Sequence, residues 1–199
     1  MKDLKVVDIF ESIQGEGNRA GQSSIFIRLS GCNKSCWFCD TDHSHFVKFT
    51  IEMIKIQIKD FKSDWIVWTG GEPLLQLTTE IIMYFKFLGY NQAIETNGTL
   101  KPPNGLDWIS ISPKVDSIQE LHDNFSNFHI NEFRFVLDKS DLKLIPKIKD
   151  LPKADFYYIS PIFYKNEIVD QNMKFTLKFV ELNPEWRISI QQHKIWHVK

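Results

Sequence analysis

The chain has 199 residues, 43% of them hydrophobic, and its 24 lysine and arginine residues nearly balance 25 aspartate and glutamate residues. A chain of this length is expected to bury roughly 70% of the surface of its unfolded form, so we expect one domain over residues 1–199. The balanced charge argues against direct nucleic-acid binding. No stretch approaches the ~20 apolar residues of a membrane span, and residues 1–10 lack a signal-peptide core, which predicts a cytoplasmic protein.

Runs rich in β-branched and aromatic residues recur along the chain and predict β-strands. In chain order we expect strands at residues 5–13, 24–30, 65–69, 92–95, 108–112, 132–137, 156–160 and 186–191. Several of these runs are continuously apolar, which indicates strands covered on both faces. Helical patterns are expected over residues 50–61, 77–88, 141–149 and 173–181. Residues 117–131 carry little periodicity, so we expect a loop in place of a helix there.

The alternation of strands and helices through the middle of the chain predicts parallel βαβ units and an α/β fold. A complete eight-stranded barrel takes ~250 residues, so a departure from the full barrel is expected. Four motifs follow directly after predicted strands, at residues 31–41, 70–73, 96–98 and 113–114. Because parallel strands end at the same edge of a sheet, these four loops are expected to share one site.

All three cysteines of the chain, Cys32, Cys36 and Cys39, lie within eight residues of one another. No cysteine remains elsewhere to close a disulfide across the fold, which predicts a reducing compartment and a metal site. The C-x3-C-x2-C spacing lets one loop, residues 31–43, wrap three thiolates around an inorganic centre. A four-iron cluster held by three cysteines keeps one iron free of protein ligands, and chemistry can occur at that iron.

Two other interpretations of this loop stay open from the spacing alone. His43 lies four residues past Cys39 and would complete a closed zinc site of three thiolates and one imidazole. The three cysteines could also be buried structural residues, although Lys34 and Ser35 make the loop polar. The aromatic Phe38 directly before the third cysteine favours the iron-sulfur interpretation.

With Phe38 in this position, the loop resembles that of the radical S-adenosylmethionine (SAM) superfamily. The resemblance implies a [4Fe-4S] cluster on Cys32, Cys36 and Cys39, whose open iron is chelated by the amino and carboxylate groups of SAM. It further implies that an electron from the cluster breaks a carbon-sulfur bond of SAM to give a 5'-deoxyadenosyl radical. The hard chemistry then belongs to the cofactor, and the protein positions it and excludes water.

Three further motifs support this interpretation and are ambiguous alone. Residues 70–73, Gly-Gly-Glu-Pro, match a second superfamily signature that receives the methionyl ammonium of SAM, although a strand-to-helix turn with proline explains them equally well. Residues 95–98 could be a simple Asn-Gly turn. Residues 112–114 could be a strand closed by proline and followed by an exposed lysine.

Taken together, the motifs resemble the 7-carboxy-7-deazaguanine synthase family. The segments that carry the resemblance are residues 12–17, 31–32, 39–41, 69–73, 95–98 and 112–114, with a weaker match at 192–194. The resemblance implies a partial (β/α) TIM-like barrel with a reduced number of helices. It also implies a homodimer.

The family's functional residues can be carried over position by position. The resemblance places five residues on the substrate: Ile13, Gln14, Gly15, Arg28 and Thr69. It places eight on SAM: Phe38, Cys39, Asp40, Gly71, Glu72, Ser112, Pro113 and Lys114. Thr41 corresponds to a Mg²⁺ ligand, an ion that keeps several waters and takes substrate oxygens. Glu16 could belong to the pocket or to the surface, and Gln192 and His193 could close the pocket or be exposed.

The implied reaction converts 6-carboxy-5,6,7,8-tetrahydropterin to 7-carboxy-7-deazaguanine with loss of ammonia, an early step toward queuosine and related deazapurines. An electron donor such as flavodoxin or ferredoxin would reduce the cluster. For Arg28 there is a physical case as well, because a guanidinium pairs with the substrate's carboxylate through two hydrogen bonds. The alternatives are a radical SAM activase that acts on a glycine of a partner protein, and a non-catalytic zinc or iron-sulfur protein.

Overall fold

The computed structural model describes residues 3–39, 41–42, 45–137, 145–164 and 167–199. Its strands are β1 (Leu4–Ile13), β2 (Ser23–Leu29), β3 (Val47–Phe49), β4 (Trp65–Gly70), β5 (Asn91–Thr96), β6 (Trp108–Ile111), β7 (Ile130–Leu137), β8 (Ala154–Pro161), β9 (Phe163–Tyr164), β10 (Glu167–Ile168) and β11 (Arg187–Ile188). Its α-helices are α1 (Ile51–Ile58), α2 (Thr79–Phe87), α3 (Ile118–Phe125), α4 (Asp170–Leu182) and α5 (Gln192–Trp196). Three short 3-10 turns are η1 (Gly17–Arg19), η2 (Pro73–Leu75) and η3 (Ile148–Asp150).

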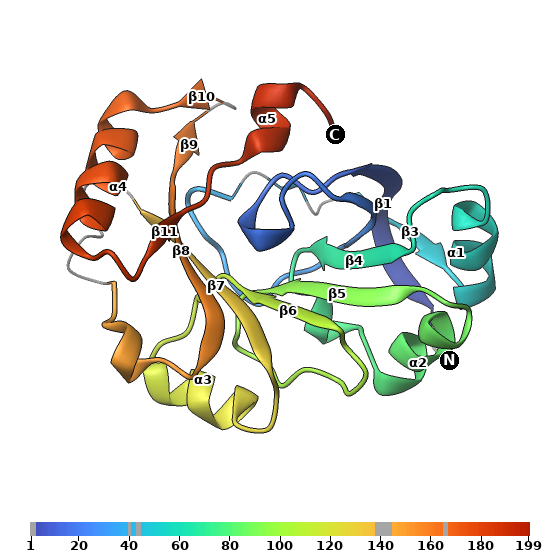
Figure 1. Cartoon of the computed structure of the whole chain (residues 1–199). Coiled ribbons are helices and arrows are strands. Elements are labelled where there is room, and N and C mark those ends of the chain that lie inside the picture. Colours follow the sequence, from blue (N-terminus) through green and yellow to red (C-terminus); the bar gives the residue numbers. More distant parts are fainter. Residues whose placement is uncertain (1–2, 40, 43–44, 138–144, 165–166) are drawn as a thin grey trace.

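One sheet dominates the described residues and curves into an open arc (Figure 1). Its strand order is β11-β8-β7-β6-β5-β4-β2-β1-β3. Neighbours from β2 to β11 are parallel, whereas β1 is antiparallel to β2 and β3 is antiparallel to β1. Because β3 and β11 stand at opposite ends of the order, the sheet does not close. This is the partial barrel that the sequence predicted.

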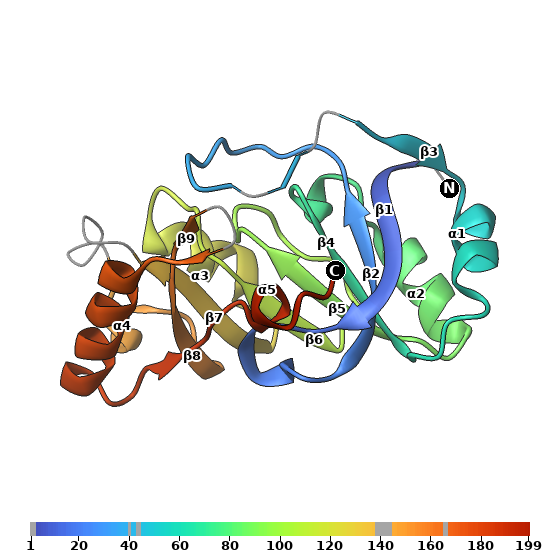
Figure 2. The same ribbon diagram turned by 90° about the horizontal axis from the view of Figure 1, so that it is seen from above.

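The helices lie on different sides of this arc. Figure 1 shows α1, α2 and α3 outside the curved sheet and α5 on its inner side, and Figure 2 shows α5 across the middle of the opening. In the part of the chain that the structure describes, no helix combines the length and the apolarity that crossing a membrane requires.

The expectation of a loop over residues 117–131 is wrong, because α3 forms there. Ser117 caps the helix by accepting a hydrogen bond from Glu120 N, and Leu121 and Phe125, four residues apart, are its buried residues. The sequence carries the signal for this helix, because Ile118, Leu121 and Phe125 recur at helical spacing and Ser117 with Glu120 forms a capping-box pattern.

The helix expected over residues 141–149 is also wrong over its described part. Residues 145–147 are irregular and η3 follows them, while residues 141–144 lie outside the described residues. Pro146 explains the error, because proline removes a backbone donor and disfavours helical backbone in the residue before it.

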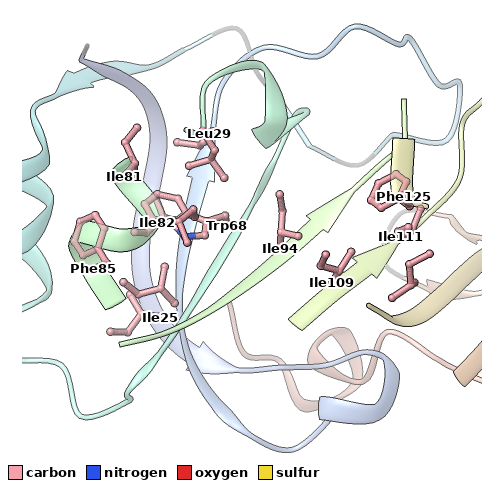
Figure 3. Packing of buried hydrophobic residues seen from close by; sticks show 14 of the residues in the cluster. Ile25, Leu29, Trp68, Ile81, Ile82, Phe85, Ile94, Ile109, Ile111 and Phe125 are labelled. Carbon is pink, nitrogen blue, oxygen red and sulfur yellow. The ribbon is translucent and has the colours of Figure 1, made fainter. Parts of the chain in front are cut away.

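The outward faces of the parallel strands carry the apolar core. Trp68 of β4 and Ile94 of β5 are fully buried against the helices outside the sheet (Figure 3). Ile66 of β4 and, from α2, Ile82 and Phe85 are fully buried in the same cluster. The outer face of these strands is thus covered by helices.

The inward faces differ from the expectation of continuously apolar strands. Glu95, Ser110 and Glu132 are cross-strand neighbours along β5, β6 and β7, and Arg134 follows Glu132 by two residues on the same face. The interior of the partial barrel is therefore charged where the outer face is apolar.

Phe85→Ala should lower the free energy of unfolding by about 3–5 kcal/mol, because it empties a fully buried position beside Trp68 and Tyr90. Phe87→Ala on the same helix is the matched control. The Phe87 side chain is 91% exposed, so its removal should change stability by less than about 0.5 kcal/mol. Chemical denaturation measures both, and equal effects would contradict the placement of α2.

Candidate active site

Two cavities lie on the inner side of the sheet, near the carboxyl ends of the parallel strands. The large cavity, about 760 Å³, is lined by the end of β1, by Arg28 of β2 and by Thr69 of β4. The cysteine cavity, about 250 Å³, is lined by Cys32, Cys36 and Cys39 and by the ends of β4 to β8. All four motif loops reach the cysteine cavity, so the prediction that they share one site is confirmed.

The two cavities share one wall. The residues that line both are Glu16, Thr41, Thr69, Glu95, Gln191 and Lys194. A group bound in the cysteine cavity would therefore lie next to a molecule held in the large cavity.

The cysteine loop is fixed to the glycine-rich loop after β4 through the backbone. Gly71 N donates to Leu29 O at 2.9 Å, and Glu72 N donates to Gly31 O at 2.8 Å. A Cβ atom at Gly71 would stand only 1.9 Å from Gly31 O, so glycine is required for this approach. The two signatures that the sequence suggested thus form one rigid unit.

The three thiols line the cysteine cavity with different exposure. Cys36 is half-buried, whereas Cys32 and Cys39 are exposed. Burial raises the pKa of the Cys36 thiol, and the charge of Lys114 opposes that rise. The three thiols therefore face one space, with a lysine ammonium beside them.

Lys114 and Ser112, which the resemblance places on SAM, line the cysteine cavity. Lys114 Nζ donates to the backbone and side-chain oxygens of Ser112, both at 3.1 Å, and lies 5.4 Å from the centre of the Phe38 ring. Burial lowers the pKa of Lys114. Phe38, Ser112, Lys114 and Gly71 all line the cysteine cavity.

The carboxylate of Glu72 faces the protein and lines neither cavity, so its contact with SAM stays a prediction. The residue is fully buried, and it accepts hydrogen bonds from Leu74 N at 3.0 Å, Thr96 Oγ1 at 2.8 Å and Asn97 N at 2.8 Å. Burial raises its pKa, and these hydrogen bonds oppose the rise. Through these hydrogen bonds, the Glu72 side chain connects the loop after β4 to the end of β5.

Other predicted residues also lie away from the cavity walls. Pro113 is half-buried and lines neither cavity, and Gln192 contributes a backbone donor to Gly15 O at 3.0 Å. Asp40 and His43 lie outside the described residues, so their predicted contacts stay untested. Among the residues that are described, no three histidine, cysteine or acidic side chains converge as ligands of a single metal ion.

Arg28 and Thr41 lie together in the large cavity. Arg28 Nη1 donates to Thr41 Oγ1 at 3.3 Å, and the guanidinium lies 5.8 Å from the centre of the Phe10 ring. Thr69 is the cross-strand neighbour of Arg28. The predicted partners of a substrate carboxylate and of Mg²⁺ are thus side by side.

Glu95 is a cavity residue that the sequence analysis missed. Its carboxylate accepts hydrogen bonds from Gln14 Nε2 at 3.1 Å, Thr69 Oγ1 at 2.8 Å and Arg134 Nη2 at 2.8 Å. Burial alone would raise the pKa of Glu95, but the charge of Arg134 and these hydrogen bonds outweigh it and lower the pKa to about 2. Glu95 is therefore an anionic acceptor in the cavity wall.

The segment after β1 completes the large cavity, which Ile13, Gln14 and Gly15 all line. Glu16, which the sequence could not place, belongs to the shared wall, and its carboxylate binds Arg134 and Gln191. Glu16 therefore lies in the pocket wall and not on the outer surface.

The C-terminal segment covers the same cavity. His193 lines it and packs so closely on Gly15 that a Cβ atom there would lie 2.3 Å from His193 Nδ1. Lys199 pairs with Asp8 of β1. The weaker sequence match at residues 192–194 thus marks a segment that closes the pocket.

Arg134, Gln191 and Lys194 are further residues that sequence reasoning missed. Arg134 and Glu132 had a signal, because two opposite charges alternate with apolar residues in an otherwise buried strand. Lys194 lies in the weaker match at residues 192–194, which assigned it no role, and Gln191 had no signal, since its role depends on where the C-terminal segment folds.

Comparisons with known proteins agree with this geometry. The family model described as "Radical SAM superfamily" matches residues 26–131. A 7-carboxy-7-deazaguanine synthase of Haemophilus influenzae is 34% identical to this chain over 97% of it and 93% of the relative. One from Bacteroides thetaiotaomicron is 31% identical, covering 98% of both chains. The chain belongs to the 7-carboxy-7-deazaguanine synthase family of the radical SAM superfamily.

A solved relative supports the fold of this family member. The crystal structure of QueE from Escherichia coli superposes with a TM-score of 0.72 at 21% identity, covering 95% of this chain and 94% of the other. Membership of the family implies a [4Fe-4S] cluster and SAM as cofactors. The residues present fit both groups, because three thiols of one loop face a cavity that leaves space beside them.

Gly71→Ala should abolish cluster loading, because the new methyl group would drive the glycine-rich loop away from Gly31. Iron and sulfide analysis after anaerobic reconstitution measures the loss. In the control Gly21→Ala, the methyl group meets open space and only the positive φ of 90° is strained. That variant should load normally, and full loading of Gly71→Ala would contradict the predicted obstruction.

Proposed function

We propose that this chain converts 6-carboxy-5,6,7,8-tetrahydropterin to 7-carboxy-7-deazaguanine with release of ammonia, as an early step toward queuosine and related 7-deazapurines. The observation that carries the proposal is the wall shared by the cysteine cavity and the large cavity. Family membership supplies the reaction class, and the shared wall supplies the contact between cofactor and substrate that this reaction needs.

Cys32, Cys36 and Cys39 hold the cluster in this proposal, and Phe38, Gly71, Ser112 and Lys114 surround SAM. When bound, these two groups together supply a 5'-deoxyadenosyl radical that takes and later returns one hydrogen atom. Lys114 lies beside the thiols in the cysteine cavity, where its amino group would pair with the carboxylate of SAM. The backbone contact between Gly31 and Gly71 fixes the distance between the cluster loop and the SAM site.

The large cavity holds the pterin. Arg28 pairs with the substrate's carboxylate through its guanidinium fork, and Thr41, 3.3 Å away, offers its hydroxyl to Mg²⁺ together with substrate oxygens. Gln14, Thr69 and Glu95 face the polar edge of the ring system. The chain's task is to hold C6 of the substrate at the shared wall, since small displacements cost large factors in rate.

The overall reaction balances without an added oxidant. Product and substrate differ by one molecule of ammonia, and the hydrogen abstracted at C6 is returned after the ring contracts. No side chain of this chain has to act as the initial base, which agrees with a cavity built from hydrogen-bonding and ion-pairing groups.

The alternative of an activase for a protein glycine receives less support. Such an enzyme admits a loop of another protein, whereas here Gln14, Arg28 and Glu95 line the large cavity and His193 covers it. A non-catalytic zinc or iron-sulfur protein would have no use for this cavity.

Further parts of the same proposal concern the chain as a whole. Residues 1–199 act as a single radical SAM domain with the cluster loop at 31–43, in the cytoplasm and as a homodimer. A flavodoxin or ferredoxin reduces the cluster. The clustering of all three cysteines in one loop supports the reducing compartment.

The decisive experiment is to incubate the anaerobically reconstituted protein with reductant, SAM, Mg²⁺ and the carboxypterin, and to follow the products by mass spectrometry. We expect 7-carboxy-7-deazaguanine, with SAM regenerated and not consumed. Accumulation of 5'-deoxyadenosine without the deazaguanine would retain the superfamily and reject the substrate. Reactions without SAM are the control and should form no product.

Gly15→Ala should raise the KM for the pterin roughly tenfold or more, because the methyl group would displace His193 from the large cavity. Cluster content should stay at the wild-type level, since Gly15 lies away from the cysteine cavity. Steady-state kinetics together with iron analysis separates the two effects. A wild-type KM would show that closure by the C-terminal segment is not needed for binding.

A further inference from the structure

Arg134, at the centre of the partial barrel, contacts three carboxylates from three parts of the chain. Nη2 donates to Glu95 Oε1 at 2.8 Å, Nη1 donates to Glu16 Oε2 at 3.2 Å, and Nε lies 3.4 Å from Glu132 Oε1. Its side chain is only 8% exposed, against 25% for Glu95 and 21% for Glu16. The two carboxylates that line both cavities are therefore held by one buried cation, which itself lines the cysteine cavity.

A second buried arginine in the barrel shows that this arrangement is particular to Arg134. Arg19 donates to neutral oxygens of Gln22 and Ser24 and stacks over Trp65, and burial lowers its pKa to about 10. Burial would lower the pKa of Arg134 too, but the three carboxylates raise it well above its usual value. Charge compensation inside the barrel is thus concentrated on Arg134.

The contacts of Arg134 determine what Glu95 can offer a ligand. A carboxylate has about four lone-pair positions. Oε1 of Glu95 already accepts from Arg134 and Gln14, and Oε2 accepts from Thr69. One acceptor position on Oε2 is left, and Glu95 lines the large cavity.

The second contact fixes the wall between the cavities. Glu16 accepts from Arg134 through Oε2 and from Gln191 Nε2 through Oε1, at 2.9 Å. Gln191 directly precedes α5, which covers the large cavity. Through Glu16, Arg134 therefore also connects the barrel interior to the segment that closes over the substrate.

We propose that Arg134 is a positioning residue for the pterin: it acts through Glu95, whose remaining acceptor position receives an N–H group of the pterin's amino-pyrimidine ring, and through Glu16 in the shared wall. The inference rests on the proposed function. A lysine cannot take this role in full, because its single ammonium lacks the planar fork that bonds several carboxylates at fixed angles.

The charged and titratable groups around Glu95 bear on the pH dependence of this contact. Those that line the same two cavities are Asp8, Glu16, Arg28, Cys32, Lys34, Cys36, Cys39, Asp42, Lys114, Arg134, His193, Lys194, His197 and Lys199. Arg19 and Glu132 lie beside Glu95 in the interior of the barrel. Arg134 supplies the charge that keeps Glu95 ionised, since it is the cation hydrogen-bonded to the Glu95 carboxylate.

The test compares Arg134→Gln, which loses the charge and the fork, with Arg134→Lys, which loses only the fork. Both should lower kcat/KM for the carboxypterin by about 10- to 100-fold, mostly through KM, with cluster content unchanged. Calorimetric titration of the pterin, without SAM, gives a readout that does not depend on turnover. Arg187→Gln, an exposed arginine outside both cavities, should bind and react like the wild type.

The pH profile of pterin binding separates positioning from a merely structural role. In the wild type and in Arg134→Lys, Glu95 stays ionised from about pH 8 to about pH 5, so protonation of Glu95 should not weaken binding over that range. In Arg134→Gln, burial raises the pKa of Glu95, so binding should weaken more than in the wild type as the pH falls over that range. Groups that all three proteins share, such as His193, cancel in this comparison.

Wild-type binding by both variants, or a loss of thermal stability alone, would overturn the role of Arg134. If Arg134→Gln does not fold, the KM of Arg134→Lys for the carboxypterin is the test, and a wild-type value would overturn the role of Arg134. Should neither fold, Glu95→Gln decides, because it removes the charge and keeps the size of the side chain: pterin binding at the wild-type level by that variant would overturn the role of Glu95 and with it that of Arg134. A wild-type protein that leaves the carboxypterin unchanged rejects the proposed function itself, which is a different outcome.

Discussion

The buried carboxylate of Glu72 is the constraint on which the geometry of the site depends. Its side chain accepts hydrogen bonds from η2 and from the end of β5, while its backbone N donates to Gly31 at the start of the cysteine loop. Three loops that follow three different strands are therefore fixed to one another by a single residue. A desolvated carboxylate is costly unless its oxygens are fully hydrogen-bonded, and these loops supply the donors.

The second constraint is electrostatic. An open barrel of this size could be filled with apolar side chains, as its outer face is, but its interior carries Glu95, Glu132 and Arg134. Buried charges of this kind add little net stability, because desolvation offsets their mutual attraction. What they give is fixed orientation, and orientation is what a reaction controlled by the placement of one substrate atom requires.

The sequence predicted the parallel sheet, the four loops at one edge and the residues of the cysteine loop, because strand periodicity and motif spacing are local properties. The loop expected over α3 overlooked three apolar residues at helical spacing behind a capping serine, and the helix expected over 141–149 runs across Pro146. The motif at residues 70–73 could not show that the Glu72 carboxylate points into the protein, since a motif names a residue type and not the direction of its side chain. The role of Gln191 could not be found, because it reaches the cavities only through the fold of the C-terminal segment.

In the part of the chain that the structure describes, the strands at the two ends of the open sheet are short. β3 has three residues with Lys48 at its centre, and β11 has two. β3 pairs only with residues 4–6 of β1, and β11 pairs only with residues 158–159 of β8, so the long strands beside them have stretches without a strand partner on that side. Long, flat edges offer a row of free backbone donors and acceptors to another chain. These stretches of β1 and β8, and not the two end strands, are therefore where the described sheet is open to extension by another strand.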